Sequence, residues 1–331
     1  IVVFTEISNM FGNTPLIAVD FKYRGKEATI YAKVESYNPT GSLKDRVAYY
    51  ILKKAYEKKE ISKNDVIVEA TSGNTGIAFS ALGAYLGHKV IIFMPDWMSR
   101  ERINLMKSYG AEVRLVSKEE GGFLGSIRMC EEMAERGGAF LPGQFSNPDN
   151  IETHVLYTGA EIIDALKGIG RTPDAVVAGV GTGGTVMGIG RAIKAVNPSA
   201  KAYPLEPLNS PTLSTGYKTG SHRIQGISDE FIPEIVKLDE LDDIVSVDDI
   251  DSIIMAKKIS ERLGLGVGIS SGANFIGAIK MMEQNSFDMT MTTVFADDNK
   301  KYLSTDYSLD WESKDEYIST RVELTGYRYI G

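Results

Sequence analysis

Lys44 is the first residue whose surroundings predict chemistry. It lies in residues 38–46, Asn-Pro-Thr-Gly-Ser-Leu-Lys-Asp-Arg, between a strand expected over 29–35 and a helix expected over 44–59. Ser42 is at the expected N-cap position, and Asp45 completes a pattern like a capping box. The positive helix end disfavours a further positive charge. A lysine amine that loses its proton more easily can form a Schiff base. A surface lysine at a capped helix start is the structural alternative.

Two further polar loops follow predicted strands, where open α/β sheets place ligands. Residues 71–76, Thr-Ser-Gly-Asn-Thr-Gly, combine hydroxyls, an amide and the N–H groups of a helix start, which suits a carboxylate. An ordinary capped turn is the alternative, although six polar or glycine residues exceed what capping requires. Residues 179–185, Gly-Val-Gly-Thr-Gly-Gly-Thr, offer glycine N–H groups at a helix start, which suits a phosphate.

The glycine loop also matches a dinucleotide-binding pattern. Gly179, Gly181 and Gly184 fit Gly-x-Gly-x-x-Gly, and Glu206 lies near the distance of a ribose partner. A nicotinamide-dependent oxidoreductase is therefore the main competing class. That class leaves Lys44 and residues 71–76 unexplained, and the chain has no well-placed histidine proton donor.

Composition excludes several classes of function. The chain has 331 residues, enough for one large or two ordinary domains. Its net charge of −8 argues against nucleic acid and anionic membranes as partners. No apolar run approaches the roughly 20 residues of a membrane span. One cysteine, Cys130, permits no disulfide framework, and three scattered histidines (His88, His154 and His222) predict no metal site. We expect a cytoplasmic protein.

The elements around these loops predict an α/β fold. Near-continuous apolar strands at 66–70, 89–94, 174–179 and 201–205 alternate with helices, which favours parallel sheets covered by helices on both faces. A long helix is expected over 151–166. The polar and aromatic tail from Asp306 is expected to be an ordered extension or a dimer contact.

A lysine for a Schiff base, a carboxylate site and a phosphate site together describe pyridoxal 5′-phosphate (PLP) holding an amino acid. Over nearly all its length the chain resembles the cysteine synthase and cystathionine β-synthase family, the fold-type-II PLP enzymes. The resemblance is carried by five motifs in the right order: residues 38–46, 72–76, 144–148, 181–185 and 268–272.

The resemblance implies a role for each matching residue. Lys44 would form the Schiff base with PLP and later move the substrate's Cα proton. The cofactor would be bound by Lys44, Asn74, Gly181, Thr182, Gly183, Gly184, Thr185 and Ser270. The substrate would be bound by Thr71, Ser72, Asn74, Thr75, Gln144 and Gly226.

Ser270 would face the pyridine nitrogen and set the reaction type. A hydroxyl leaves that nitrogen largely unprotonated, so the ring is a weaker electron sink. This favours prompt loss of a β-leaving group, giving an aminoacrylate, over transamination. The expected reaction is β-elimination followed by β-addition. A helix N-cap is the structural alternative for Ser270, and Ser271 fits that role equally well.

Residues 226–233, Gly-Ile-Ser-Asp-Glu-Phe-Ile-Pro, depart from the family pattern. Cysteine synthases usually carry small residues at positions 229 and 230, and cystathionine β-synthases an aromatic residue followed by an acid. A carboxylate near the substrate's β-carbon would repel hydrosulfide and accept a proton from water. We therefore predict that L-cysteine loses hydrosulfide and that water activated by Asp229 adds to give L-serine. Glu230 is expected to be structural. Alternatively, both acids point outward and tune solubility.

Other activities of the family stay open. Cysteine synthase, which uses O-acetylserine and sulfide, is the first alternative, followed by cystathionine β-synthase and by deamination of serine or threonine. The resemblance implies a smaller mobile domain over 42–148 that binds the substrate carboxylate and closes on the substrate. It implies a larger PLP-phosphate domain over 1–41 and 149–331, PLP in the interdomain cleft, and a homodimer.

Overall fold

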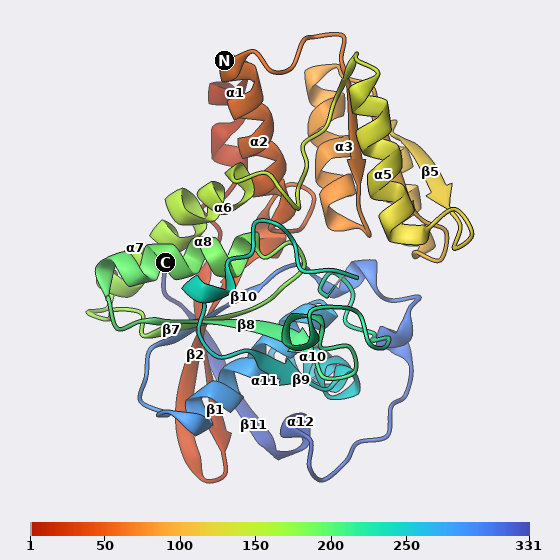
Figure 1. The fold of residues 1–331 in the computed structure, drawn as a ribbon. Coiled ribbons are helices and arrows are strands. Elements are labelled where there is room, and N and C mark those ends of the chain that lie inside the picture. Colours follow the sequence, from red (N-terminus) through yellow and green to blue (C-terminus); the bar gives the residue numbers. More distant parts are fainter. Residues whose placement is uncertain (1, 229) are drawn as a thin grey trace. The chain divides into compact units, whose positions relative to one another are not determined.

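The computed structural model describes residues 2–228 and 230–331, so Asp229 lies outside the described residues. The chain divides into two compact units, residues 1–11 with 38–150 and residues 12–37 with 151–331. Each unit has its own sheet (Figure 1). Each also has its own hydrophobic core. The expected α/β fold is confirmed.

The first unit is built on four parallel strands in the order β5-β4-β3-β6. One face packs on α2 and α3 through a cluster that includes Ile67 and Ile77, and the other packs on α5 through Val68 and Cys130. The elements are α1 (Val2–Ile7), α2 (Lys44–Lys58), β3 (Val66–Ala70), α3 (Asn74–Leu86), β4 (Val90–Pro95), α4 (Arg100–Ser108), β5 (Glu112–Val116), α5 (Gly122–Glu135) and β6 (Ala139–Phe140).

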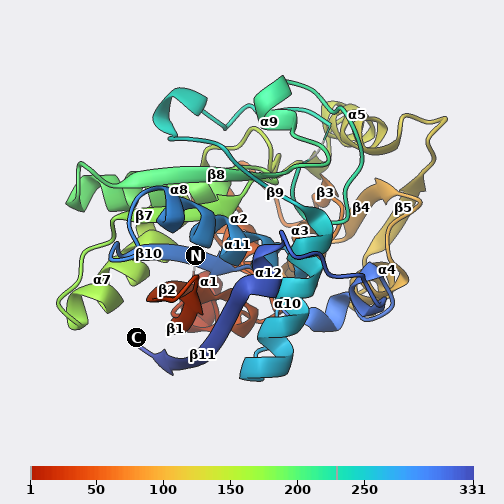
Figure 2. The same cartoon turned by 90° about the horizontal axis from the view of Figure 1, so that it is seen from below.

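The second unit is built on seven strands in the order β11-β1-β2-β10-β7-β8-β9 (Figure 2). Helices α10 and α11 cover one face, and α7 and α8 cover the other. The elements are β1 (Leu16–Tyr23), β2 (Lys26–Val34), α7 (Ala160–Gly168), β7 (Ala175–Gly179), α8 (Gly184–Val196), β8 (Lys201–Pro207), α9 (Thr212–Thr215), β9 (Val245–Val247), α10 (Asp249–Leu263), α11 (Ile269–Gln284), β10 (Met291–Phe295), α12 (Ile318–Arg321) and β11 (Val322–Tyr329).

Three features differ from the sequence-based expectations. The larger sheet is mixed, because β1 pairs antiparallel with both β2 and β11. The long helix expected over 151–166 is α6 (Asp149–Thr153), a π-helical turn (His154–Gly159) and α7. Residues up to 11 belong to the first unit, whereas we expected them in the larger one. The physical reason is Phe4, whose ring lies 5.8 Å from that of Tyr49 and 5.4 Å from that of Tyr56.

The described residues contain neither a membrane-spanning helix nor a cluster of metal-ligating side chains. No helix in this part of the chain is long and apolar enough to cross a membrane. No group of three or more histidine, cysteine, aspartate or glutamate side chains in the same residues is arranged to hold a metal ion.

Candidate active site

Lys44 is the first residue of α2 and follows a loop that is closed by hydrogen bonds. The Asp45 carboxylate accepts hydrogen bonds from the Thr40 N–H at 2.9 Å and from the Thr40 hydroxyl at 2.6 Å. The Ser42 hydroxyl accepts one from the N–H of Lys44 at 3.2 Å, although the N-cap residue is Leu43. The expected capping box is therefore wrong. The acid instead turns back to Thr40 and fixes the loop that precedes the lysine.

The polar segment 71–76 connects β3 to α3, as expected. The N–H of Gly73 donates to the Thr71 hydroxyl at 2.9 Å. Gly73 is the N-cap residue of α3 and supplies no side-chain cap. The first N–H groups of a helix have no partner within it, and such an N-terminus is suited to a carboxylate. A Cβ at Gly73 would lie 2.5 Å from Arg102 Nε, so a side chain there would force Arg102 to move.

Gln144 is brought against this segment from 69 residues further along the chain. The Thr75 hydroxyl donates to Gln144 Oε1 at 2.6 Å, and Gln144 Nε2 donates to the carbonyl of Ala70 at 2.7 Å. The Thr75 proton is engaged by Gln144. A carboxylate held here would therefore be bound by the second hydrogen on Gln144 Nε2 and by the helix N–H groups.

Glu69 is a candidate site residue that the sequence analysis missed. Its side chain is 2% exposed within β3 and accepts hydrogen bonds from the N–H groups of Ala70 at 3.0 Å and Gln144 at 3.2 Å. Burial raises the pKa of the Glu69 carboxyl to about 7, against the opposing effects of these hydrogen bonds and of the positive charge on Lys44. The signal in the sequence was an acid inside an apolar strand, since buried carboxylates are rare.

The glycine-rich segment after β7 fits a phosphate. Gly183, the N-cap residue of α8, has φ 86°, a left-handed conformation that favours glycine. A Cβ at Gly183 would lie 2.3 Å from Val236 Cγ2, and one at Gly181 would lie 2.4 Å from the carbonyl oxygen of Gly226. Backbone N–H groups at a helix start therefore line a cradle that only glycine permits, which is the arrangement that binds phosphate.

The π-helical turn lies beside this phosphate segment and was also missed. His154 is fully buried, and its Nδ1 lies 2.8 Å from the Thr158 hydroxyl. Its Nε2 lies 3.5 Å from the hydroxyl of Thr185, the last residue of the predicted phosphate motif. A Cβ at Gly188 would lie 2.4 Å from His154 Cβ, so glycine permits this approach. Because π-helical turns often occur at functional sites, His154 is a candidate support for Thr185.

Ser270 and Ser271 lie in the first turn of α11, whose N-cap residue is Gly268. Neither serine is the N-cap, so that structural alternative is wrong. Ser270 keeps 7% of its surface exposed, whereas Ser271 is 0% exposed. The Ser271 hydroxyl has no hydrogen-bond partner among the described residues. Ser270 is thus the more accessible of the two serines.

The segment before Asp229 is fixed by polar contacts of Ser228. Its N–H donates to the carbonyl of Val180 at 2.7 Å, and its hydroxyl donates to the carbonyl of Ser210 at 3.0 Å. Its carbonyl oxygen lies 3.1 Å from Nε2 of His222. Ser228 has φ 52°, which is uncommon for a residue other than glycine. Such a conformation persists where surrounding contacts hold it, and it is concentrated at functional sites.

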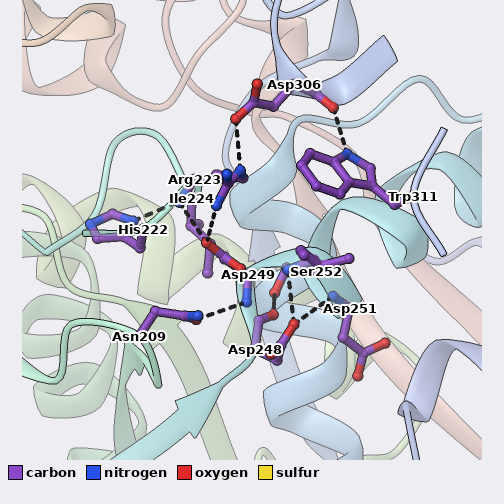
Figure 3. A network of polar contacts seen from close by, with 11 residues as sticks. Asn209, His222, Arg223, Ile224, Asp248, Asp249, Asp251, Ser252, Asp306 and Trp311 are labelled. Atoms are coloured by element: carbon purple, nitrogen blue, oxygen red, sulfur yellow. Dashed lines mark hydrogen bonds and ion pairs between the residues drawn. The ribbon is translucent and has the colours of Figure 1, made fainter. Parts of the chain in front are cut away.

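His222 holds this segment as a neutral imidazole. The N–H of Ile224 donates to His222 Nδ1 at 3.1 Å (Figure 3). The single proton of the neutral ring therefore lies on Nε2, which donates to the carbonyl of Ser228. Burial lowers the pKa of His222, which keeps the ring uncharged near neutral pH.

Arg223 anchors the same loop to two other parts of the second unit (Figure 3). Its N–H donates to the Asp249 carboxylate, at the start of α10, at 2.9 Å. Its Nε lies 3.0 Å from the carboxylate of Asp306, and its guanidinium lies 5.0 Å from the ring centre of Trp311. Of the two loop acids, Glu230 pairs with Lys218 at 3.4 Å, in keeping with a structural role.

Glu206, the predicted ribose partner of the dinucleotide alternative, is occupied elsewhere. It is 1% exposed and accepts hydrogen bonds from the N–H groups of Leu213 at 2.8 Å and Ser214 at 3.2 Å. The Ser246 hydroxyl donates to it at 3.3 Å. Glu206 therefore fixes the start of α9, and the dinucleotide alternative loses its ribose contact.

The α/β fold and these segments define one class of enzyme, and comparison with known proteins identifies the same class. The chain belongs to the pyridoxal-phosphate dependent enzymes, whose family model matches residues 7–296. Within that class it is a cysteine synthase-family enzyme, and its cofactor is PLP. It is 39% identical to a cysteine synthase of Staphylococcus aureus (strain Mu50 / ATCC 700699) over 306 residues, which cover 92% of this chain and 97% of that protein.

Two solved structures are more similar still. A hydrogen sulfide-producing enzyme from Fusobacterium nucleatum matches with a TM-score of 0.96 and 56% identity, covering 99% of each chain. An aspartate-to-asparagine mutant of a hydrogen sulfide-producing enzyme, in complex with an α-aminoacrylate intermediate, matches with a TM-score of 0.96 and 57% identity, covering 98% of each chain.

Proposed function

We propose that the enzyme converts L-cysteine and water to L-serine and hydrogen sulfide. The sulfur leaves the β-carbon as hydrosulfide and takes a proton, and the oxygen of water takes its place. The observation that carries this proposal is the 56% identity over 99% of both chains to a hydrogen sulfide-producing enzyme. The Asp-Glu pair that follows the constrained Ser228 supports it.

Residues of the two units would divide cofactor binding, substrate binding and proton transfer among them. Bound PLP supplies the electron sink that lets a β-substituent leave. Gly181, Thr182, Gly183, Gly184 and Thr185 would hold its phosphate, and Asn74 and Ser270 would bind its ring. Thr71, Ser72, Thr75, Gln144 and Gly226 would orient the substrate. Lys44 Nζ would take the proton from the substrate's Cα, as an amine positioned for general-base catalysis can.

Asp229 would act as the base that takes a proton from water. A carboxylate there would also repel hydrosulfide anion, which favours its release over its return. The solved aspartate-to-asparagine mutant with bound α-aminoacrylate supports an aspartate acting after sulfur has left, in that related enzyme. The pairing of Glu230 with Lys218 leaves Asp229 as the acid of this loop proposed to face the substrate.

The test compares Asp229→Asn with Glu230→Gln as the matched control. We expect Asp229→Asn to lower the rate of sulfide and serine formation from L-cysteine by about 100-fold, the low end of the effect of a general base. PLP content, read from absorbance, should stay at the wild-type level. Glu230→Gln should stay within about threefold of wild type, since exposed ion pairs contribute little. Unchanged sulfide formation by Asp229→Asn would remove the base role.

Cysteine synthesis from O-acetylserine and sulfide is the second candidate, favoured by the 39% identity to a cysteine synthase. The purified enzyme with O-acetylserine and sulfide, compared with L-cysteine alone, separates the two. Faster cysteine formation than sulfide release would favour this candidate.

We also propose the organisation implied by the family. Residues 42–148, within the first unit, would form the mobile substrate-carboxylate domain, and the second unit, residues 12–37 with 151–331, would bind the PLP phosphate. The enzyme would be a cytoplasmic homodimer.

A further inference from the structure

Glu69 lies where the ladder between β3 and β6 ends. The two strands pair only at Val66 with Ala139 and at Ile67 with Phe140. Beyond that point the chain diverges toward Gln144, and the Glu69 carboxylate supplies the acceptors for backbone N–H groups on both sides. It accepts from Ala70 on its own strand and from Gln144 on the other. The Glu69 side chain thus joins β3 to the segment after β6, where the two strands no longer share backbone hydrogen bonds.

Hydrogen bonds connect Glu69, through Gln144, to residues 71–76, the segment proposed to bind the substrate carboxylate. Gln144, whose N–H Glu69 holds, binds the Ala70 carbonyl and accepts from the Thr75 hydroxyl. The Gln144 carbonyl is fixed in turn by Asn150 Nδ2 at 2.9 Å. By binding the backbone N–H of Gln144, the buried Glu69 carboxylate therefore sets where the Gln144 side-chain amide lies relative to the first turn of α3.

A neutral side chain would not make the same contacts. A carboxylate accepts through both oxygens, whereas a glutamine amide presents one acceptor and one NH₂ group. At position 69 that NH₂ group would face a backbone N–H, donor against donor. Burying an acid is costly, and burial raises the pKa of Glu69 to about 7. Lys44 at the start of α2 and Cys130 on α5 are the titratable groups that interact with it.

We propose that Glu69 is a positioning residue for the substrate's α-carboxylate, acting through Gln144. The inference rests on the proposed role of residues 71–76 and Gln144 in holding that carboxylate. It assigns Glu69 no contact with substrate or cofactor. It predicts that loss of the acid weakens binding of ligands that carry a carboxylate and spares ligands that lack one.

The test uses the holoenzyme and two amines that lack a β-leaving group. L-Alanine carries a carboxylate, and L-alaninamide carries an uncharged amide instead. Binding of each is titrated through the absorbance of bound PLP. The variants are Glu69→Gln and the matched control Glu112→Gln, an exposed acid on β5 of the same sheet that pairs with Lys89 and Arg114.

We expect Glu69→Gln to weaken L-alanine binding about tenfold, the effect of leaving a buried donor unsatisfied. Binding of L-alaninamide should stay within about twofold, and Glu112→Gln should change neither ligand. Equal weakening of both ligands, or of neither, would overturn the proposal. If Glu69→Gln does not fold, Glu69→Asp places the carboxylate one methylene short and should give the same selective loss. Unaltered selectivity in Glu69→Asp would also overturn it.

The outcome is distinguishable from failure of the proposed function. A wild-type enzyme whose PLP absorbance responds to L-alanine, but which releases no sulfide from L-cysteine, fails the proposed function and leaves this inference testable. A wild-type enzyme that releases sulfide, with Glu69 variants that bind L-alanine normally, fails this inference alone.

Discussion

Single residues of the first unit show how function and stability oppose each other. Glu69 is buried in a strand whose other residues are valine, isoleucine and alanine. Its hydrogen-bond donors are backbone N–H groups, which favour the charged form, while burial disfavours it. A residue serving stability alone would not need to be ionisable here. Its presence is better explained by the segment it holds.

The pKa of Glu69 predicts how stability changes with pH. Burial raises that pKa from 4.5 to about 7, so the folded chain keeps the proton to higher pH than the unfolded chain. Stability therefore falls as pH rises between those values, by about 3 kcal/mol from this group. Urea unfolding of wild type and Glu69→Gln at pH 5 and pH 8 measures it. The wild type should lose more stability than the variant, and equal losses would contradict the prediction.

Residue types that carry chemistry were predictable, whereas their supports were not. Lys44, residues 71–76 and the glycine loop stand out in the sequence because hydroxyl and glycine residues cluster after apolar strands. Glu69 and His154 act through buried contacts that join distant segments, Glu69 to Gln144 and His154 to Thr185. No local pattern encodes such a pairing, although an acid in an apolar strand was a usable signal.

At the scale of elements, local patterns predicted most boundaries and missed the irregular ones. The expected strand over 66–70 is β3, and the helix expected over 44–59 is α2, which ends one residue earlier. The π-helical turn lies inside one continuous helical pattern, so periodicity alone could not reveal it. The contact between His154 and Gly188 of α8 accompanies it and depends on tertiary packing.

The turn from β7 into α8 allows a controlled test of the phosphate cradle. Gly183 and Gly216 both have φ 86°, so alanine costs each about 1 kcal/mol of backbone strain. Only at Gly183 would the added Cβ also collide, 2.3 Å from Val236 Cγ2, whereas nothing lies within 4 Å at Gly216. We expect Gly183→Ala to lower PLP affinity by about tenfold or more, since the N–H groups at a helix start must shift. Gly216→Ala should retain wild-type affinity.

Absorbance of bound PLP after dialysis, together with Tm, measures this difference. Adding Val236→Ala to Gly183→Ala removes the colliding methyl group and should restore part of the affinity. Wild-type PLP content in Gly183→Ala would show that the phosphate is bound elsewhere.

At the scale of the whole chain, the pairing in the larger sheet between β1, early in the chain, and β11, late in it, was not predictable from the sequence. β1 pairs with β2 across a two-residue turn, but it also pairs with β11, which lies about 300 residues further on. The sequence of β11, Val-Glu-Leu-Thr-Gly-Tyr-Arg-Tyr, places successive side chains on opposite faces, as any strand does. Alternation predicts a strand, but it does not name the partner strand.

The tail from Asp306 was expected to be an ordered extension or a dimer contact. The pairing of its strand β11 with β1 allows a test that distinguishes these two roles. Val322 is 2% exposed, and Leu324 packs against the core of the second unit, so removal of residues 322–331 should cost about 3 kcal/mol. It would also uncover the edge of β1 and promote aggregation. Tyr327 and Tyr329 are 46% and 71% exposed, so replacing both with serine should leave the unfolding free energy unchanged.

Urea unfolding and sedimentation velocity of both variants distinguish the two roles. If the strand closes the sheet, truncation destabilises the chain while the double serine variant keeps the wild-type stability and sedimentation coefficient. A double serine variant that sediments more slowly than wild type would make the exposed face of β11 a subunit contact. A truncated chain as stable as wild type would contradict the structural role, because burial of Val322 and Leu324 would then contribute nothing.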